Sequence, residues 1–200
     1  MTGERVVVFV DYQNVYMGAR SAFRPDASHH VDGQIRPLPL GLRLRGDGRV
    51  LQGVRVYRGF PSEHHDPKGY SACQRQVARW NQTESVTAIT RSLNYRRPQT
   101  PREKGIDVSI AVDMVAMAVR GELDVAVLFS GDTDLLPAAE FIAAHLGPAS
   151  IELAAWQPSS AEPPRPLRLK GRDTTTHLLN EQLYEAVHDD TDYLRRTRRR

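Results

Sequence analysis

The chain has 200 residues, of which 40% are hydrophobic and 26% are charged. This size and composition predict one soluble globular domain spanning residues 1–200, because a chain of this length can bury a substantial core. No run of about eighteen apolar residues is present, and a single cysteine, Cys73, excludes an internal disulfide and a cysteine-based structural zinc site. We therefore expect a cytoplasmic protein that does not enter a membrane.

The charge balance favours an anionic partner. The formal net charge is +3 and the sequence pI is about 9.2. Much of the positive excess lies in a basic tail at residues 194–200, which either contacts a polyanion or is a solvated chain end. The partner must therefore be inferred from the interior of the chain.

Apolar runs that are typical of strands alternate with amphipathic segments that are typical of helices. Strands are predicted at residues 6–10, 50–57, 86–93, 123–129 and 150–155. Helices are predicted to begin near Val15 and to span residues 68–80, 106–119, 135–146 and 174–187, the last with a threonine-rich N-terminal cap. This order indicates an α/β domain in which helices flank a central, mostly parallel sheet.

Two segments lack a sustained period. Residues 24–49 are rich in Pro, Gly, His and Arg, and their leucines alternate, which predicts a long loop or a hairpin insertion. Residues 157–172 are rich in proline and are predicted to form a surface loop.

Carboxylates follow two of the predicted strands at the point where each strand ends. Asp11 comes directly after the first strand, and Asp132 and Asp134 follow the fourth. Because the carboxyl ends of parallel strands meet at one edge of a sheet, these side chains are expected to lie together. Asp107 begins the helix that leads into the fourth strand, and it reaches the same edge if the preceding loop crosses it.

Carboxylates gathered at one place repel one another, so at neutral pH they need a cation or bound protons. The other ligands nearby are also oxygens, from the hydroxyls of Ser130 and Thr133 and the amide of Asn14. Mg²⁺ or Mn²⁺ suits such a set better than zinc, and such ions activate water and neutralise charge at a phosphodiester. The alternative for Asp134 taken alone is a helix cap.

Three segments resemble the signature segments of a known family. They are VFVDYQNVY at 8–16, KGIDVSIAVDMV at 104–115 and LFSGDTDLLPAAEF at 128–141. Together they resemble the NYN domain family, a branch of the PIN-like, 5′-nuclease-related superfamily. The resemblance implies a three-layer fold with a central, mostly parallel sheet of about five strands. It also implies a metal-dependent ribonuclease with an acidic pocket at the carboxyl edge of that sheet.

The resemblance also assigns roles to residues. The aspartate and asparagine of the family's first segment fall on Asp11 and Asn14, and its remaining acids fall on Asp107, Asp132 and Asp134. These four aspartates are thereby implied to bind metal and to be catalytic. We also expect one of them, such as Asp134 acting through water, to help deprotonate the nucleophile. The segments at 24–49 and 157–172 depart from the family's pattern and leave substrate choice open.

Several basic and aromatic residues are candidates for holding single-stranded or structured RNA. Lys104 is placed to hold a phosphate, and Tyr95 to stack on a base while Arg96 or Arg97 holds the backbone. Arg58, at the end of the second strand, extends this track together with a basic helix face formed by Lys68, Arg75 and Arg79. Each is equally an ordinary surface side chain.

Other features have plainer interpretations. Asp113 is expected to be structural or to support the site indirectly, and Tyr70 and Trp80 to lie in the core. The adjacent histidines at 29–30 and 64–65 are poorly spaced for binding one metal and are expected to be solvated.

Two other functions stay open at this stage. One is a non-catalytic RNA-binding or protein-interaction module, and the other is a phosphatase acting through the same acids. The sequence also leaves the oligomeric state open, with a homodimer among the alternatives.

Overall fold

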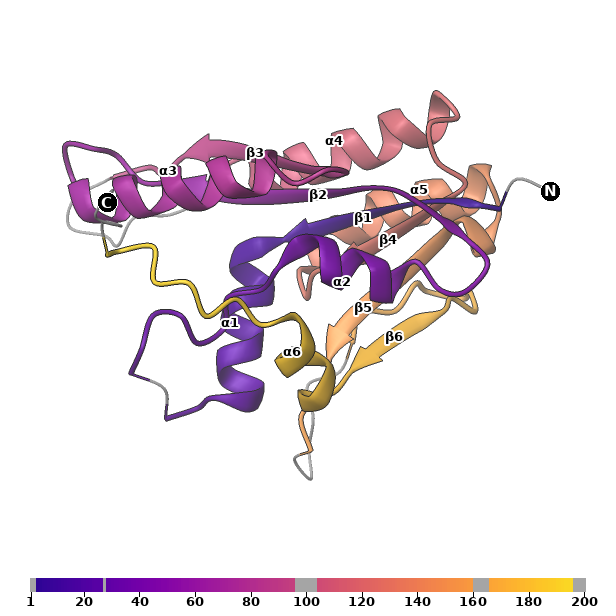
Figure 1. Ribbon diagram of the computed structural model, residues 1–200. Coiled ribbons are helices and arrows are strands. Elements are labelled where there is room, and N and C mark those ends of the chain that lie inside the picture. The colour runs from indigo at the N-terminus through magenta and orange to yellow at the C-terminus, as the bar shows by residue number, and fades with distance from the viewer. Residues whose placement is uncertain (1–2, 27, 96–103, 160–165, 196–200) are drawn as a thin grey trace.

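A computed structural model describes residues 3–26, 28–95, 104–159 and 166–195 (Figure 1). Six strands form one sheet in the order β3-β2-β1-β4-β5-β6, and all neighbours are parallel. The strands are β1 (Arg5–Asp11), β2 (Val50–Phe60), β3 (Val86–Ser92), β4 (Val125–Phe129), β5 (Ile151–Trp156) and β6 (Thr176–Leu179). The α/β class and the parallel central sheet are thereby confirmed.

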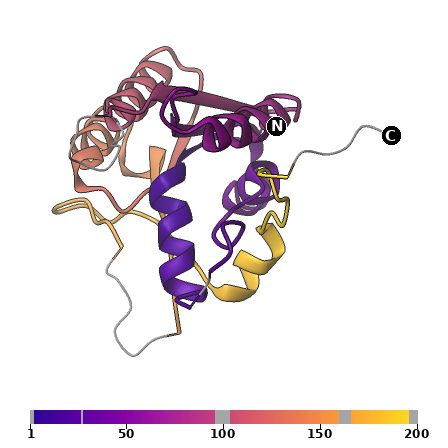
Figure 2. The same cartoon turned by 90° about the vertical axis from the view of Figure 1, so that its left-hand side faces the viewer.

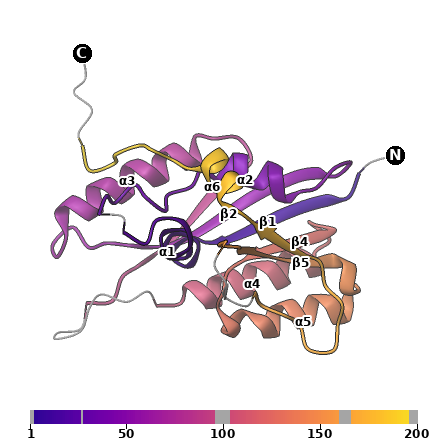
Figure 3. The ribbon, with the colours of Figure 1, turned by 90° about the horizontal axis from the view of Figure 1, so that it is seen from below.

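Helices cover both faces of this sheet (Figure 3). On one face lie α1 (Tyr12–Phe23), α2 (Pro37–Leu44), α3 (Pro67–Asn81) and α6 (Glu181–Val187). On the other lie α4 (Ile106–Val119) and α5 (Leu136–His145), with the short 3₁₀ turns η1 (Thr133–Leu135) and η2 (Pro148–Ser150) at the ends of α5. None of the helices in the described ranges is long and apolar enough to cross a bilayer.

Strand β1 is central because it is apolar on both sides. Val6, Val8 and Val10 point into the core beneath α1, and Val7 and Phe9 point into the core beneath α4 and α5. Successive strand residues face opposite sides of a sheet, so only an unbroken apolar run satisfies both cores. The strand predicted at residues 6–10 is thereby confirmed.

Residues 24–49 differ from the predicted loop or hairpin, because Pro37–Leu44 forms helix α2. Leu40 and Leu44, one helical turn apart, are fully buried, whereas Leu42 between them is 45% exposed. A hairpin strand would have turned all three to the same side, so the spacing of four and not the spacing of two decides the local structure. A proline at the first helical position fixes a backbone angle that suits a helix start.

Residues 174–187 also differ from the prediction, which was a single helix. Thr176–Leu179 forms β6, which pairs with β5 and adds a strand to the expected sheet, and only Glu181–Val187 is helical. Threonine is β-branched, which suits a strand as well as a helix cap, and here it lies in the strand. The helix cap is Asn180, whose Oδ1 accepts a hydrogen bond of 3.0 Å from the Leu183 amide.

The carboxyl ends of all strands lie at one edge, which Figure 2 places toward the viewer. The order of the strands reverses next to β1. Strands β2 and β3 lie on one side of it, whereas β4, β5 and β6 lie on the other. In open parallel sheets the crevice at such a point is the usual place for a ligand. The start of α1 and the loop after β4 both lie there.

The packing of α2 on β2 gives the first testable prediction. Gly41 lies in α2, and a Cβ at this position would overlap the Cγ2 methyl of buried Val54. Overpacking costs about 1–3 kcal/mol, whereas alanine favours a helix over glycine by about 1 kcal/mol. We therefore expect Gly41→Ala to lower the free energy of unfolding, as measured by urea denaturation.

Gly53→Ala is the matched control, because the nearest atom to a Cβ there is Ser85 O at 3.6 Å, an ordinary contact. This substitution is expected to change the free energy of unfolding by no more than about 0.5 kcal/mol. A Gly41→Ala protein as stable as this control would contradict the described packing of α2.

Candidate active site

The carboxyl ends of β1 and β4 lie side by side, with Val10 opposite Phe129. The residues that follow, Asp11 and Ser130, therefore meet at the edge of the sheet. The Ser130 hydroxyl donates a hydrogen bond of 2.8 Å to Asp11 Oδ2. This hydrogen bond directly joins the loop after β4 to the end of β1, two of the segments that were predicted to form the site.

Asp11 is the most buried acid of the site, with 5% of its surface exposed. Its Oδ1 accepts a hydrogen bond from the Asn14 amide, so the carboxylate also caps α1. Burial is the largest cause that raises the pKa of Asp11, and the charges of Asp107 and Asp132 raise it further. The hydrogen bonds from Ser130 and Asn14 act in the opposite direction. Ionisation of Asp11 therefore costs more free energy in the folded protein than in the unfolded chain.

The loop after β4 is ordered by short hydrogen bonds. The Asp132 amide donates to Ser130 Oγ at 3.0 Å, and the Asp134 amide donates to Asp132 Oδ1 at 2.9 Å. The Gly131 amide donates to Asn14 Oδ1 at 2.8 Å, which ties this loop to α1. A Cβ at position 131 would lie only 3.1 Å from the same oxygen, so glycine permits this close approach. Asp132 is half-buried and Asp134 is exposed.

Asp107 reaches the site from the other side, in the first turn of α4. The turn begins at Gly105, whose φ of 78° lies in the left-handed region that favours glycine. Burial raises the pKa of Asp107, and the charges of Asp132 and Asp134 add to that increase. The aspartates that the sequence singled out therefore lie within electrostatic reach of one another.

The model of the NYN domain family matches residues 5–165. The chain belongs to the NYN domain family. Membership places it among the PIN-like nuclease families and implies a nuclease-type function related to RNA.

A crystal structure of a protein of unknown function from Vibrio parahaemolyticus is similar to this NYN domain, with a TM-score of 0.53 and 21% identity, over 77% of this chain and 81% of that chain. At this identity the similarity concerns the fold alone. No functionally curated protein matches the chain.

NYN and PIN-like nucleases generally depend on divalent metal ions. The donor set suits such an ion in its chemistry, since it consists of oxygens and two of its carboxylates have raised pKa values that a nearby cation would lower. Within the described residues, however, no group of three or more His, Cys, Asp or Glu side chains is placed to hold one ion as they stand. Binding through three of these acids therefore requires their side chains to move closer together.

Asp113 lies on α4 but has a different environment from Asp107. Arg55 Nη2 donates to its Oδ2 at 2.7 Å, and the Tyr57 hydroxyl donates to the same oxygen at 2.8 Å. Burial opposes its ionisation, but the hydrogen bonds from Arg55 and Tyr57 outweigh that effect and lower the pKa of Asp113. Its carboxylate is already compensated, which agrees with a structural role.

The predicted RNA-contacting residues are more scattered. Thr133 and Lys104 are exposed at the ends of the loops that carry the acids. Tyr95 is less accessible than expected, because its ring stacks on His65 at 4.3 Å and its hydroxyl accepts a hydrogen bond from the Ser62 amide. Arg96 and Arg97 lie outside the described residues, as do residues 160–165 and 196–200.

Arg58 does not join the acids. Its guanidinium lies over the Tyr12 ring, 4.9 Å from the ring centre, and donates a hydrogen bond to Gln76 Oε1. Residue 58 points to the face of the sheet covered by α3, because neighbouring Tyr57 packs on the opposite face. The sequence placed Arg58 at the correct edge but could not assign its face.

Two pockets flank α1, and sequence reasoning missed both. One, of about 530 Å³, opens beside the acids and is lined by Asn14, Ser130, Gly131 and Trp156 among others. The second, of about 390 Å³, lies between α1 and α3 and contains Gln34 and Gln76 in its wall. Isolated glutamines in a helix and a loop follow no pattern, so no signal in the sequence marked the second pocket.

The raised pKa of Asp107 yields a prediction with a defined sign. Its ionised form is less favourable in the folded than in the unfolded state, so ionisation lowers stability as the pH rises through the unfolded and then the folded pKa. In EDTA at pH 7, Asp107→Asn should therefore raise the melting temperature. At about pH 3, below the ordinary aspartate pKa, this difference should largely vanish.

Asp113→Asn is the matched control on the same helix. The folded-state pKa of Asp113 is lowered, so its ionised form stabilises the fold above the unfolded pKa and this stability is lost as the pH falls. At pH 7 this substitution should lower the melting temperature. Thermal unfolding of both variants in EDTA tests the account, and equal decreases in both would contradict the clustering of Asp107 with the other acids.

Proposed function

We propose that this NYN domain is a metal-dependent ribonuclease that hydrolyses the phosphodiester bonds of RNA. The observation that carries the proposal is the electrostatic coupling of Asp11 and Asp107 to the aspartates of the β4 loop at the carboxyl edge of the sheet. Family membership supports an RNA-related nuclease, and a cluster of aspartates in which two carboxyls have raised pKa values suits a cation-assisted reaction.

The residues that would hold Mg²⁺ or Mn²⁺ are Asp11, Asp107, Asp132 and Asp134. The bound ion supplies charge neutralisation at the scissile phosphate and lowers the pKa of water. The chain's own contribution is orientation. Asp11 is fixed by two hydrogen bonds, one from Ser130 and one from Asn14, and Asp132 is fixed through the turn that its Oδ1 caps.

Asp134 has the freedom that a proton acceptor needs. Its side chain is exposed, and within the described residues its carboxylate makes no hydrogen bond, so it is available to receive a proton from the attacking water. Ser130 is unsuited as a nucleophile, because its hydroxyl donates to Asp11 and accepts from the Asp132 amide. Its role in this proposal is to hold the two loops at a fixed distance.

Substrate RNA would approach along the carboxyl edge. The pocket of about 530 Å³ beside Asn14 and Gly131 offers room for part of the strand next to the acids. Exposed Lys104, before α4, supplies a positive charge for a backbone phosphate. Thr133, exposed at the start of η1, adds a hydroxyl at the same place.

A non-catalytic RNA-binding module is the second candidate function. It is favoured by the spacing of the acids, because no three of the described His, Cys, Asp or Glu side chains are placed to hold one ion without movement. Incubation with labelled single-stranded RNA in Mn²⁺, with EDTA as the control, separates the two functions. Binding without products supports the non-catalytic module, whereas metal-dependent products support the nuclease.

Asp132→Asn tests the catalytic assignment. The asparagine keeps the oxygen that accepts the hydrogen bond from the Asp134 amide, so the turn should be preserved. We expect RNA cleavage to fall by at least about 100-fold, because removing one electrostatic stabiliser commonly costs that much. The rate of product formation in Mn²⁺ and the melting temperature should be measured on the same preparation.

Asp47→Asn makes the same chemical change in an exposed turn at the opposite edge of the sheet, just before β2 begins. It should leave cleavage unaltered. Full manganese-dependent activity in a folded Asp132→Asn protein would rule out the assignment of Asp132.

A further inference from the structure

A pocket of about 390 Å³ lies between α1 and α3, close to the acids, and the proposed chemistry does not use it. It opens at the carboxyl ends of β1 and β2, and its volume falls within the range of about 300–1,000 Å³ that small-molecule sites occupy. Its wall is largely apolar and aromatic, with a few polar groups. Residues that define it are Tyr12, Tyr16, Arg58, Gln76, Tyr193 and Leu194.

Buried amides give the floor of the pocket a fixed geometry. Gln76 and Gln34 are 3% and 5% exposed. Gln76 Nε2 donates to the Tyr12 hydroxyl at 2.9 Å and to Gln34 Oε1 at 2.8 Å. Arg58 donates to Gln76 Oε1, so its guanidinium is held in place by the same network. A site with this much internal bonding is formed before any ligand arrives.

Arg58 brings an uncompensated positive charge to this apolar pocket. Its guanidinium lies over the rings of Tyr12 and Trp80, at 4.9 Å and 5.9 Å from their centres. Across the described part of the chain Arg58 forms no ion pair. Arg58 is half-buried, and its planar guanidinium matches the geometry of a carboxylate or phosphate, so an anionic group on the ligand is the expected partner.

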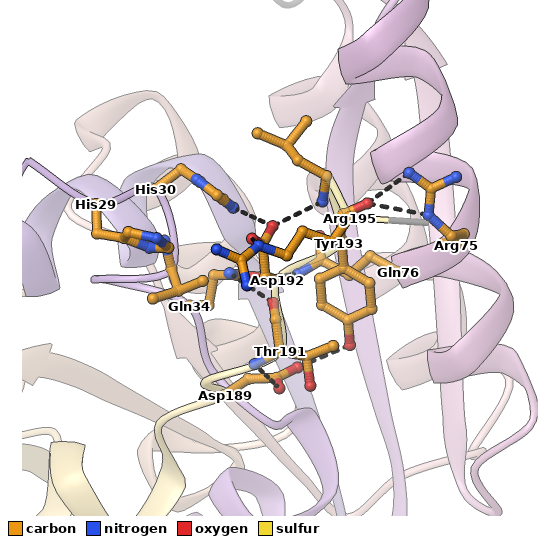
Figure 4. A network of polar contacts seen from close by, with 12 residues as sticks. His29, His30, Gln34, Arg75, Gln76, Asp189, Thr191, Asp192, Tyr193 and Arg195 are labelled. Atoms are coloured by element: carbon orange, nitrogen blue, oxygen red, sulfur yellow. Dashed lines mark hydrogen bonds and ion pairs between the residues drawn. The ribbon is translucent and has the colours of Figure 1, made fainter. Parts of the chain in front are cut away.

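One wall of the pocket comes from the C-terminal segment 188–195, which lies beside α3 (Figure 4). Arg75 donates to Tyr193 O through Nε at 2.9 Å and Nη2 at 2.5 Å. His30 Nε2 lies 2.7 Å from Asp192 Oδ1. Arg75 was expected to form part of a basic RNA-binding face and His30 to be solvated, but both instead anchor this segment.

The segment adds a component that family membership does not imply. The NYN match ends at residue 165, whereas Tyr193 and Leu194 lie beyond it. Tyr193 is 7% exposed, and its hydroxyl donates to Asp189 Oδ2 at 2.8 Å. Part of the pocket wall therefore lies outside the residues that the family model matches.

We propose that this pocket binds one nucleotide of the RNA substrate. The apolar and aromatic walls would receive the base, and Arg58 would pair with a phosphate, which is how single strands are commonly gripped. Tyr12 follows Asp11 directly in the chain, so a nucleotide held there lies beside the acids and fixes which phosphodiester reaches them. This inference rests on the proposed ribonuclease function and specifies how the substrate is positioned.

The test measures nucleotide binding without cleavage. The Asp132→Asn protein in EDTA is titrated with the four ribonucleoside 5′-monophosphates, the corresponding nucleosides and ribose 5-phosphate, followed by calorimetry and NMR. At least one monophosphate should bind, and more tightly than its nucleoside or ribose 5-phosphate. Arg58→Gln should remove the preference for the phosphorylated ligand.

A filling variant identifies the pocket as the binding site. Ala72 lines the pocket from α3, and Ala72→Phe occupies its space without deleting a side-chain hydrogen bond. Ala78→Phe places the same side chain at an exposed position of the same helix that does not line the pocket. In the Asp132→Asn background, Ala72→Phe should weaken binding by about tenfold or more and Ala78→Phe should leave it unchanged. Melting temperatures of both variants report on folding.

These binding experiments test the nucleotide site independently of RNA cleavage. Failure of every monophosphate to bind at millimolar concentration, or equal binding by the two phenylalanine variants, would overturn the nucleotide site. So would saturable binding of a hydrophobic dye that nucleotides do not displace, which indicates an apolar ligand. Nucleotide binding in a protein that cleaves no RNA would retain the pocket and remove only the ribonuclease proposal.

Discussion

The hydrogen bond from the Ser130 hydroxyl to the Asp11 carboxylate holds together two loops that their own charge drives apart. Asp11 is buried beside two further negative charges, and its raised pKa records the cost of that position. Two interactions offset this cost. They are the parallel pairing of β1 with β4 and the hydrogen bond from the Gly131 amide to Asn14 Oδ1. Stability is thereby given up at the one edge where a cation and a phosphate are expected to bind.

The parts of the molecule that could be predicted from the sequence are those that depend on local pattern. The apolar run at 6–10 identified the central strand, and acids placed directly after strands identified the edge where they meet. The segment at 37–44 was misjudged because its alternating leucines favour a strand, whereas packing of Leu40 and Leu44, four residues apart, against the core favours the helix. The threonines before α6 were misjudged because strand pairing with β5 is a contact between distant residues.

Residues whose roles depend on tertiary contacts were the hardest to predict. Asn14 was identified as a site residue, but its observed part is to accept a hydrogen bond from Gly131. Arg58 lies at the expected edge yet serves a different pocket, because the side of the sheet that it faces depends on the register of β2. The C-terminal segment carries no recognisable motif, and only its contacts with Arg75 and His30 reveal that it completes a pocket.

Folding gathers aspartates whose mutual repulsion a divalent cation is expected to relieve. Carboxyl-carbon NMR titration of Asp11 and Asp107, first in EDTA and then in Mg²⁺, measures both the repulsion and its relief. We expect pKa values above the ordinary aspartate value in EDTA and a decrease of both when Mg²⁺ is added. Ordinary pKa values in EDTA, or raised values that Mg²⁺ leaves unchanged, would refute this electrostatic coupling.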